Sequence, residues 1–377
     1  MAVVVYRGPL ERSRLGYLLE SASRAYGDVR LIWLVPPKVG LARGGRGIGA
    51  GSTRTTQDIA AFERFLQANG KVTDYVLLDG RLQSMPTTLR RLRRLVAARD
   101  APLVCVGFTS LLYGRAVRGP LGRVVWCPNG IPEERLLHRD GPRDRAYVRA
   151  QWRATVTGAM PALIVTVSHR MSELIQARWP SAPCFAAPNC VRAEVFRPSP
   201  GHARNRVTYL GTGAPWQGLS YTSEVWGQLA RLLPDVRFRV ISRDERTRIL
   251  ADRVPGSSIE FSSAEEPADV ARLLWGARLG FLVRSEHVVN RVSYPTKFGE
   301  YVAAGVPVVA TDVGWDLTAL VHDTGCGRLV PPDASPVETA RAAARAYEED
   351  LAPGCDAAAR ALDRDLWVDR LAARFPT

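Results

Sequence analysis

The sequence predicts an α/β protein built from two parallel-sheet domains. Short apolar runs that are typical of buried strands alternate with helical stretches, and this alternation starts near residue 3 and starts again near residue 207. Strand–helix–strand order favours parallel pairing with right-handed crossovers. A chain of 377 residues is also long enough for two domains of ordinary size.

Composition narrows the class of protein. Hydrophobic residues make up 46% of the chain, but no apolar run reaches the length of about 20 residues that a membrane helix needs. The N-terminus turns apolar at once, without a basic region before it, so we expect a first strand rather than a signal peptide and a cytoplasmic location. None of the six cysteines lie two residues apart, and no histidines stand at ligand spacing around them, so we expect no metal site.

A net charge of +14 favours anionic partners such as nucleotides, phospholipid surfaces or nucleic acid. Nucleic acid is the least expected of these, because no recognition motif or basic strand with interleaved aromatic residues is present.

The first half contains alternating strands and helices. Leu15 to Ala22 recur at helical spacing and Gly27 closes that helix, because glycine accepts a left-handed terminal conformation. The expected strands are 3–6, 29–35, 75–78, 103–106, 124–126, 163–167 and 184–187, and two further helices are expected at 58–68 and 87–100. Ser168 is expected to cap another helix.

Two stretches of this half are basic. Residues 36–56 contain a glycine cluster that resembles a dinucleotide fingerprint, but it follows the second strand instead of opening a helix after the first. We therefore expect a mobile loop in which Arg43, Arg46 and Arg54 close over an anionic ligand. The helix at 87–100 has a leucine stripe between arginines, which predicts a helix that flanks the sheet, with peripheral contact to an anionic inner membrane face as the alternative.

The second half contains the most informative stretch, 293–312. Pro295 suits the first turn of a helix, Gly305 suits its end, and a short buried strand follows. The free N–H groups of a helix start bind anions such as phosphate. Lys297 lies in that first turn, and Glu300 lies deeper, where a carboxylate can accept two hydroxyl hydrogen bonds. The alternative is a surface helix with a weak Lys–Glu pair.

Residues 295–309 resemble the nucleotide-sugar-binding segment of GT-B glycosyltransferases, family 4 in particular, in residue type and spacing. The resemblance implies that Glu300 binds the donor ribose. It also implies that the loop and helix start hold the donor diphosphate, through Ser293, Tyr294, Thr296 and Lys297. Many family members carry a second glutamate eight residues before the first, where this chain has Val292.

A glycine-rich turn from Gly211 to Gly218 follows the strand at 207–210. Close glycines let the backbone approach a phosphate, and the resemblance makes this turn part of the donor site. Family members commonly carry arginine and lysine where this chain has Thr212 and Gln217, so Arg243 and Arg284 are expected to help Lys297 neutralise the diphosphate. The expected donor set comprises Gly211, Thr212, Gly213, Gln217, Arg243, Arg284, Ser293, Tyr294, Thr296, Lys297 and Glu300.

Acceptor residues are expected at strand ends in the first domain, where open α/β sheets bind ligands. Asn129 and Gly130 follow one strand, at a point where the family often has His-Gly or Arg-Gly near the sugar. His169 follows the next strand. A plain Asn-Gly turn and a structural histidine are the alternatives. Asn129 is grouped with Lys297 and Glu300 as catalytic, although its amide cannot act as a general base.

The resemblance implies two Rossmann-like domains facing across a cleft. We expect residues 1–198 to bind the acceptor, 199–355 to bind the donor, and 356–377 to form a helix that crosses back onto the first domain. The expected reaction moves a sugar from a nucleotide-diphosphate donor to a hydroxyl or similar nucleophile, with retention and without metal or other cofactor. The acceptor is a small molecule, a lipid-linked molecule or a glycan. A GT-B sugar-nucleotide epimerase and a nucleotide-sugar-binding protein without transferase activity are the alternatives.

Overall fold

The computed structural model describes residues 2–6, 12–35, 72–79, 85–96, 102–118, 124–199, 204–264 and 266–376. The expected loop at 36–56, with Arg43, Arg46 and Arg54, and the expected helix at 58–68 lie outside these ranges. Contacts divide the chain into two compact units, residues 1–187 with 365–377, and residues 188–364. The predicted boundaries at 198 and 355 both fall inside the second unit.

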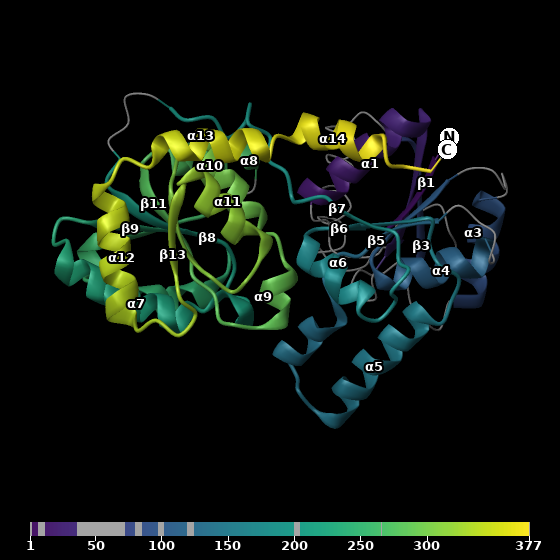
Figure 1. The fold of residues 1–377 in the computed structure, drawn as a ribbon, viewed down its shortest axis with the longest axis horizontal. Coiled ribbons are helices and arrows are strands. Elements are labelled where there is room, and N and C mark those ends of the chain that lie inside the picture. Colours follow the sequence, from purple (N-terminus) through teal and green to yellow (C-terminus); the bar gives the residue numbers. More distant parts are fainter. Residues whose placement is uncertain are drawn as a thin grey trace, which may run out of the picture. The chain divides into compact units, whose positions relative to one another are not determined.

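The first unit is built on a parallel sheet with the strand order β3-β2-β1-β4-β5-β6-β7 (Figure 1). The strands are β1 (Ala2–Tyr6), β2 (Val29–Val35), β3 (Val72–Asp79), β4 (Leu103–Val106), β5 (Val124–Cys127), β6 (Leu163–Thr166) and β7 (Cys184–Ala186). The helices are α1 (Arg12–Tyr26), α3 (Met85–Leu95), α4 (Phe108–Arg118), the 3-10 turn η2 (Pro132–Leu137), α5 (Pro142–Val156), α6 (His169–Gln176) and α14 (Arg364–Ala372). Every residue of β1 is buried, as expected for a parallel strand covered on both faces.

Helix α3 turns its apolar stripe inward. Leu92 is fully buried, whereas the four arginines of this helix are exposed. This arrangement fits a helix that flanks the sheet and presents a solvated basic face.

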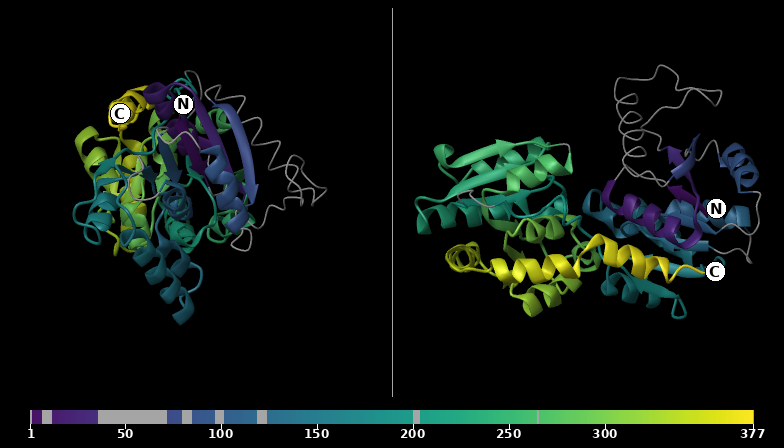
Figure 2. Two further views of the ribbon diagram at one scale, coloured as in Figure 1. Left: turned by 90° about the vertical axis from the view of Figure 1, so that its right-hand side faces the viewer. Right: turned by 90° about the horizontal axis from the view of Figure 1, so that it is seen from above.

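The chain end packs on α1 in the first unit, where Figure 2 shows α14 in yellow at the C-terminus. The Tyr17 hydroxyl donates to the Trp367 carbonyl at 3.2 Å. The rings of Tyr26 and Phe375 stack at 5.5 Å, and Arg24 pairs with Asp369. These contacts fasten the last helix to α1.

The second unit repeats the same plan, with the strand order β10-β9-β8-β11-β12-β13. The strands are β8 (Arg206–Leu210), β9 (Arg237–Ile241), β10 (Ile259–Ser262), β11 (Ala277–Leu282), β12 (Val308–Thr311) and β13 (Gly327–Val330). The helical segments are η3 (Pro215–Gln217), α7 (Leu219–Leu232), η4 (Glu245–Ala251), η5 (Gly256–Ser258), α8 (Pro267–Leu274), α9 (Val288–Val292), α10 (Thr296–Ala303), α11 (Asp316–Thr324), α12 (Pro336–Glu348) and α13 (Ala352–Ala361). Trp226 anchors the core, with its ring 4.8 Å from that of Phe238 and 6.0 Å from that of Phe281.

Each sheet has one point at which the strand order reverses, between β1 and β4 and between β8 and β11. Ligands of open α/β sheets bind outside the carboxyl ends of the strands at such a point. In the second unit this rule directs attention to the loops that follow β8 and β11.

The prediction of two parallel-sheet domains is confirmed. Two helices differ from the prediction. The residues at 269–277 also predict a helix, but α8 ends at Leu274 and Ala277 already belongs to β11. The stretch from Pro295 to Gly305 predicts a helix of about a dozen residues, whereas α10 has eight. Within the described ranges, no helix combines the length and hydrophobicity of a membrane span.

Candidate functional site

The start of α10 is open. Pro295 is its N-cap and provides no side-chain hydrogen bond to the helix. The N–H groups of Thr296 and Lys297 belong to the first turn, which has no intrahelical acceptors for them. At the other end, Gly305 adopts a φ of +68°, and Arg204 donates to the carbonyls of Ala304 and Gly305. Arg204 therefore satisfies the carbonyls at the C-terminus of the helix, whereas the N–H groups at its N-terminus can bind an anion.

The side chain of Lys297 connects this helix start to the glycine-rich turn after β8. Its amine donates to Gln217 Oε1 at 3.2 Å and lies 5.4 Å from the ring centre of Tyr209. A Cβ added at Gly211 would lie only 1.9 Å from this amine, and Gly211 has a φ of +147°. The positive φ would strain any other residue at this position, and a side chain there would displace the lysine amine.

Lys297 and Glu300 have opposite pKa shifts. Desolvation lowers the pKa of Lys297 to about 7, with the nearby Arg284 acting in the same direction and Glu300 against it. Desolvation raises the pKa of Glu300 to about 7, and Lys297 opposes this shift. The amine bonds to Gln217 and not to Glu300, so the simple surface pair considered from the sequence is not the arrangement found. Both side chains lie in low-dielectric surroundings, and the nearby groups of opposite charge offset only part of the cost of desolvation.

Arg284 follows β11 and is the most deeply buried cation of the site, with 6% exposure. One guanidinium nitrogen lies 3.2 Å from Ser293 Oγ and 3.3 Å from Asn290 Oδ1, and the group lies 5.4 Å from the ring centre of Trp315. Its Nε is buried without a hydrogen-bond partner in the described part of the chain. Burial lowers the pKa of Arg284 to about 10. A buried cation with neutral partners is expensive unless an anion binds beside it.

Asn290 holds this network in place and was not singled out by the sequence. It is fully buried, and its amide donates to the carbonyls of Trp216 at 3.2 Å and Ser285 at 2.8 Å. Its Oδ1 faces Arg284. The sequence does contain a signal for Asn290, because this residue stands in the valine-rich segment Val288–Val292. A buried amide needs hydrogen-bond partners, so an asparagine in such a segment indicates a polar network.

The glycine-rich turn is also fixed from the loop after β9. The Gly213 N–H donates to Asp244 Oδ2 at 2.8 Å, and a Cβ at Gly213 would lie 2.4 Å from Arg246 Cβ. The hydrogen bond from Arg246 holds the pKa of Asp244 far below its usual range, with help from the Gly213 N–H. Thr212 and Arg243 are exposed on these two loops.

Two predicted positions lie in the core. The Tyr294 side chain is 6% exposed and its ring lies 6.4 Å from that of Phe298, while its carbonyl accepts from Asn189. Because the Tyr294 side chain is buried, only its main chain can contact a bound sugar donor. Val292 is 4% exposed, so an apolar side chain packs at the position where many members of the resembling family carry a glutamate.

The predicted acceptor residues lie in the first unit. Asn129 and Gly130 follow β5, and His169 follows its neighbour β6, so all three are at the same edge of the sheet. Gly130 has a φ of +83°, and a Cβ there would lie 2.1 Å from Glu134 Oε1, which accepts from the Ile131 N–H. His169 is exposed at the start of α6, directly after Ser168, whose hydroxyl caps the helix as predicted.

Among the residues that the structure describes, no group of three His, Cys, Asp or Glu side chains is arranged to hold a metal ion. The six cysteines are free thiols, four of them buried. The predicted donor residues thus offer main-chain groups, polar side chains, three cations (Arg243, Arg284 and Lys297) and one carboxylate, Glu300.

Comparison with known proteins identifies the second unit. Residues 204–349 match the family described as glycosyl transferases group 1. No curated protein matches the chain significantly. Three solved structures show the fold. HepE of Anabaena is 14% identical with a TM-score of 0.71, over 99% of this chain and 98% of that one. Sucrose-phosphate synthase of Thermosynechococcus elongatus is 13% identical with a TM-score of 0.72, again over 99% and 98%. WaaG, a glycosyltransferase of lipopolysaccharide biosynthesis, is 16% identical with a TM-score of 0.63, over 100% and 99%.

These neighbours have the GT-B fold of two Rossmann-like domains, which is the fold of this chain. The chain therefore has the GT-B fold, and its residues 204–349 match the group 1 glycosyl transferase family.

Proposed function

We propose that the enzyme takes its sugar from a nucleotide-diphosphate donor that binds at the start of α10. The observation that carries this proposal is the convergence of two incompletely neutralised cations, Lys297 and Arg284, on an open helix N-terminus. A diphosphate supplies the negative charge that this arrangement lacks.

The donor diphosphate is assigned to the N–H groups of Thr296 and Lys297, the Lys297 amine and the Ser293 hydroxyl, with Arg284 behind them. Gly211 and Gly213 let the backbone approach the phosphates. Glu300 lies one turn further into the helix, about 5 Å along its axis, where the ribose hydroxyls follow the diphosphate. An ionised Glu300 accepts both hydroxyl hydrogen bonds.

Catalysis on this arrangement is electrostatic. As the bond between the anomeric carbon and the phosphate oxygen breaks, negative charge develops on the leaving diphosphate, and the fixed cations stabilise it. The acceptor oxygen forms the new bond to the anomeric carbon, and its proton passes to a phosphate oxygen of the leaving group. This route gives retention and uses no protein base, in accord with an asparagine at position 129.

The first unit binds the acceptor in this proposal, with Asn129, Gly130 and His169 at the edge of its sheet. The acceptor carries a hydroxyl or similar nucleophile on a small molecule, a lipid-linked molecule or a glycan. The exposed arginines of α3 support a peripheral contact with an anionic membrane surface as a further part of the proposal.

The base of the donor is testable directly. Structures of HepE contain UDP, alone or with glucose, and UDP-glucose, which supports a uridine donor here. Thermal-shift titration with UDP-, GDP-, dTDP- and CMP-sugars should raise Tm with one base in preference to the others. No shift with any of them would count against the proposal. NMR of the product anomer then tests retention.

A further inference from the structure

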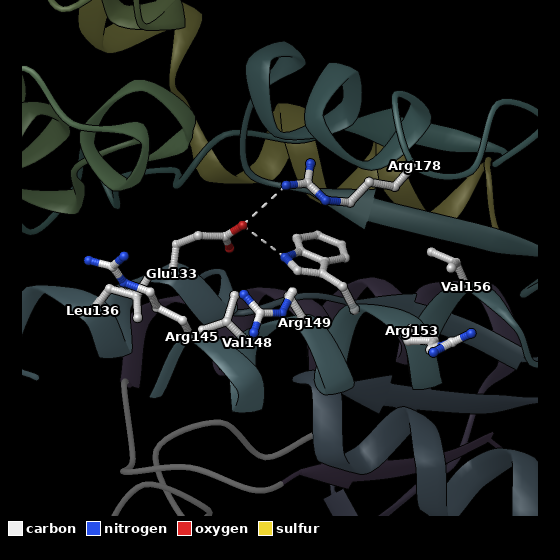
Figure 3. Close-up of a pocket in the computed structure, with 9 residues that line it drawn as sticks. Glu133, Leu136, Arg145, Val148, Arg149, Arg153, Val156 and Arg178 are labelled. Atoms are coloured by element: carbon white, nitrogen blue, oxygen red, sulfur yellow. Dashed lines mark hydrogen bonds and ion pairs between the residues drawn. The ribbon is translucent and has the colours of Figure 1, made fainter. Parts of the chain in front are cut away.

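We propose that a basic pocket of the first unit, separate from Asn129, Gly130 and His169, holds the anionic end of the acceptor. In this proposal the acceptor joins a phosphate or carboxylate to an apolar body. The proposal rests on the proposed function, because it names the substrate class of the same transfer. The pocket has a volume of about 610 Å³ and is lined by η2, α5 and the segment after α6 (Figure 3). This volume lies within the range of small-molecule sites, about 300–1,000 Å³.

One wall of the pocket is pre-organised around Glu133. Its Oε1 accepts from Trp152 Nε1 at 2.9 Å and from Arg178 at 3.2 Å, and the guanidinium of Arg178 lies 4.5 Å from the ring centre of Trp152. Figure 3 shows these two dashed contacts meeting at one carboxylate. The second oxygen, Oε2, is buried and has no partner among the described residues. In the proposal this oxygen accepts from a hydroxyl or amide donor of the ligand.

A row of arginines on α5, the helix that also carries Trp152, lines the same pocket. Arg145, Arg149 and Arg153 recur every four residues and line the pocket. Arg145 is neutralised by two hydrogen bonds to Asp140, each of 2.7 Å. Arg149 and Arg153 have no carboxylate partner in the described part of the chain. Like charges at this helical spacing destabilise a helix mildly, and an anion in the pocket removes that repulsion.

The remaining lining is apolar, with Leu136, Val148 and Val156 between the charged groups. Two uncompensated cations select an anion, and the adjoining aliphatic surface favours a ligand whose body is not fully hydrophilic. A sugar phosphate without an apolar part would leave this surface exposed to water. The chemistry of the pocket thus favours an acidic amphiphile over a neutral glycan.

Octyl phosphate, kept below its micellar concentration, is the probe for this pocket. Calorimetric titration should detect binding to the wild type, tighter than that of inorganic phosphate or octanol. The double variant Arg149→Gln/Arg153→Gln should weaken it about tenfold or more, because two charge-assisted contacts are removed. The matched control, Arg139→Gln/Arg143→Gln, removes two exposed arginines of the same region that do not line the pocket, and its Kd should stay within about twofold of the wild type.

Equal weakening in both double variants would overturn the proposal, because it would show a general charge effect. Binding only to vesicles of equal phosphatidylcholine and phosphatidylglycerol, with no binding of free octyl phosphate, would also overturn it in favour of a membrane surface. UDP titration of the same samples separates the two proposals. If the Arg149→Gln/Arg153→Gln variant loses octyl phosphate binding but binds UDP as the wild type does, the result supports both the acceptor pocket and the donor site. If the wild type does not bind UDP, the result contradicts the proposed donor site alone.

Discussion

The second unit places its cations at the strand ends of its sheet, whereas the first unit places them on the outside of a helix. Arg284 is buried to 6% exposure and makes contacts with Ser293 and Asn290. Arg149 and Arg153 are exposed on α5, although both line a pocket. Both sheets share the same central strand order, so the fold alone does not set this difference.

In our two proposals, a similar scaffold holds two kinds of anion site. Buried, fixed cations resist rearrangement and suit a constant group such as a diphosphate, because their orientation is set before binding. Exposed arginines on a helix adapt to ligands of different shape, at lower affinity. Substitutions in the second unit should therefore have large effects on the donor, and substitutions in the first unit small effects that are confined to the acceptor.

The largest effect is expected for Glu300→Ala. Donor binding should weaken by about 2–4 kcal/mol, because two buried hydroxyls lose a charged acceptor. Glu224→Ala, which removes an exposed carboxylate of α7, is the control and should leave the affinity unchanged. Titration with UDP measures both, and an unaltered Kd in Glu300→Ala would contradict the ribose assignment.

Arg284→Met should weaken UDP binding by about 1.5–3 kcal/mol, the usual contribution of a hydrogen-bonded charge. Binding of uridine, which lacks the diphosphate, should not change. The free variant should melt at the same or a higher temperature, because a buried cation with only neutral partners is removed. Arg231→Met on the surface of α7 is the control. A drop in Tm together with loss of uridine binding would indicate a structural role instead.

Proton uptake on UDP binding is the next expectation. Because desolvation holds the pKa of Lys297 at about 7, the free amine is mostly neutral at pH 8 and charged at pH 6. The bound diphosphate favours the charged form and raises this pKa, so binding should take up close to one proton at pH 8 and almost none from this group at pH 6. Calorimetric titration in buffers of different ionisation enthalpy measures the number of protons taken up on UDP binding. The Lys297→Met variant should lose the uptake at pH 8; if it persists, another group is responsible.

The smallest effects are expected at the first-unit strand ends. Asn129→Ala and His169→Ala should raise the KM for the acceptor by about 3–10-fold, the cost of about one neutral hydrogen bond. UDP affinity should be the same as in the wild type. A large loss of UDP affinity in either variant would contradict the proposal that the first unit binds the acceptor and the second unit binds the donor.

The sequence predicted the sheet strands well because buried parallel strands are short apolar runs, and β2 and β4 have the expected bounds. It missed α4 and α5, whose faces mix apolar, small and charged residues without a clean helical stripe. It also missed α7, although the buried residues of that helix recur at helical spacing. The sequence singled out Lys297 and Glu300 because a local motif contains both residues.

The rest of the site depends on contacts between segments far apart in the chain. Asn290 reaches Trp216, and Tyr209 lies beside Lys297, and no local pattern encodes either contact. The pocket on α5 escaped notice for the same reason, because Glu133 and Arg178 meet only in the folded unit.

A crystal structure with UDP tests the account most directly. The account predicts the diphosphate within hydrogen-bond distance of the Lys297 amine and the first N–H groups of α10, with the ribose hydroxyls on Glu300. UDP bound at any other place, with the start of α10 empty, would contradict it.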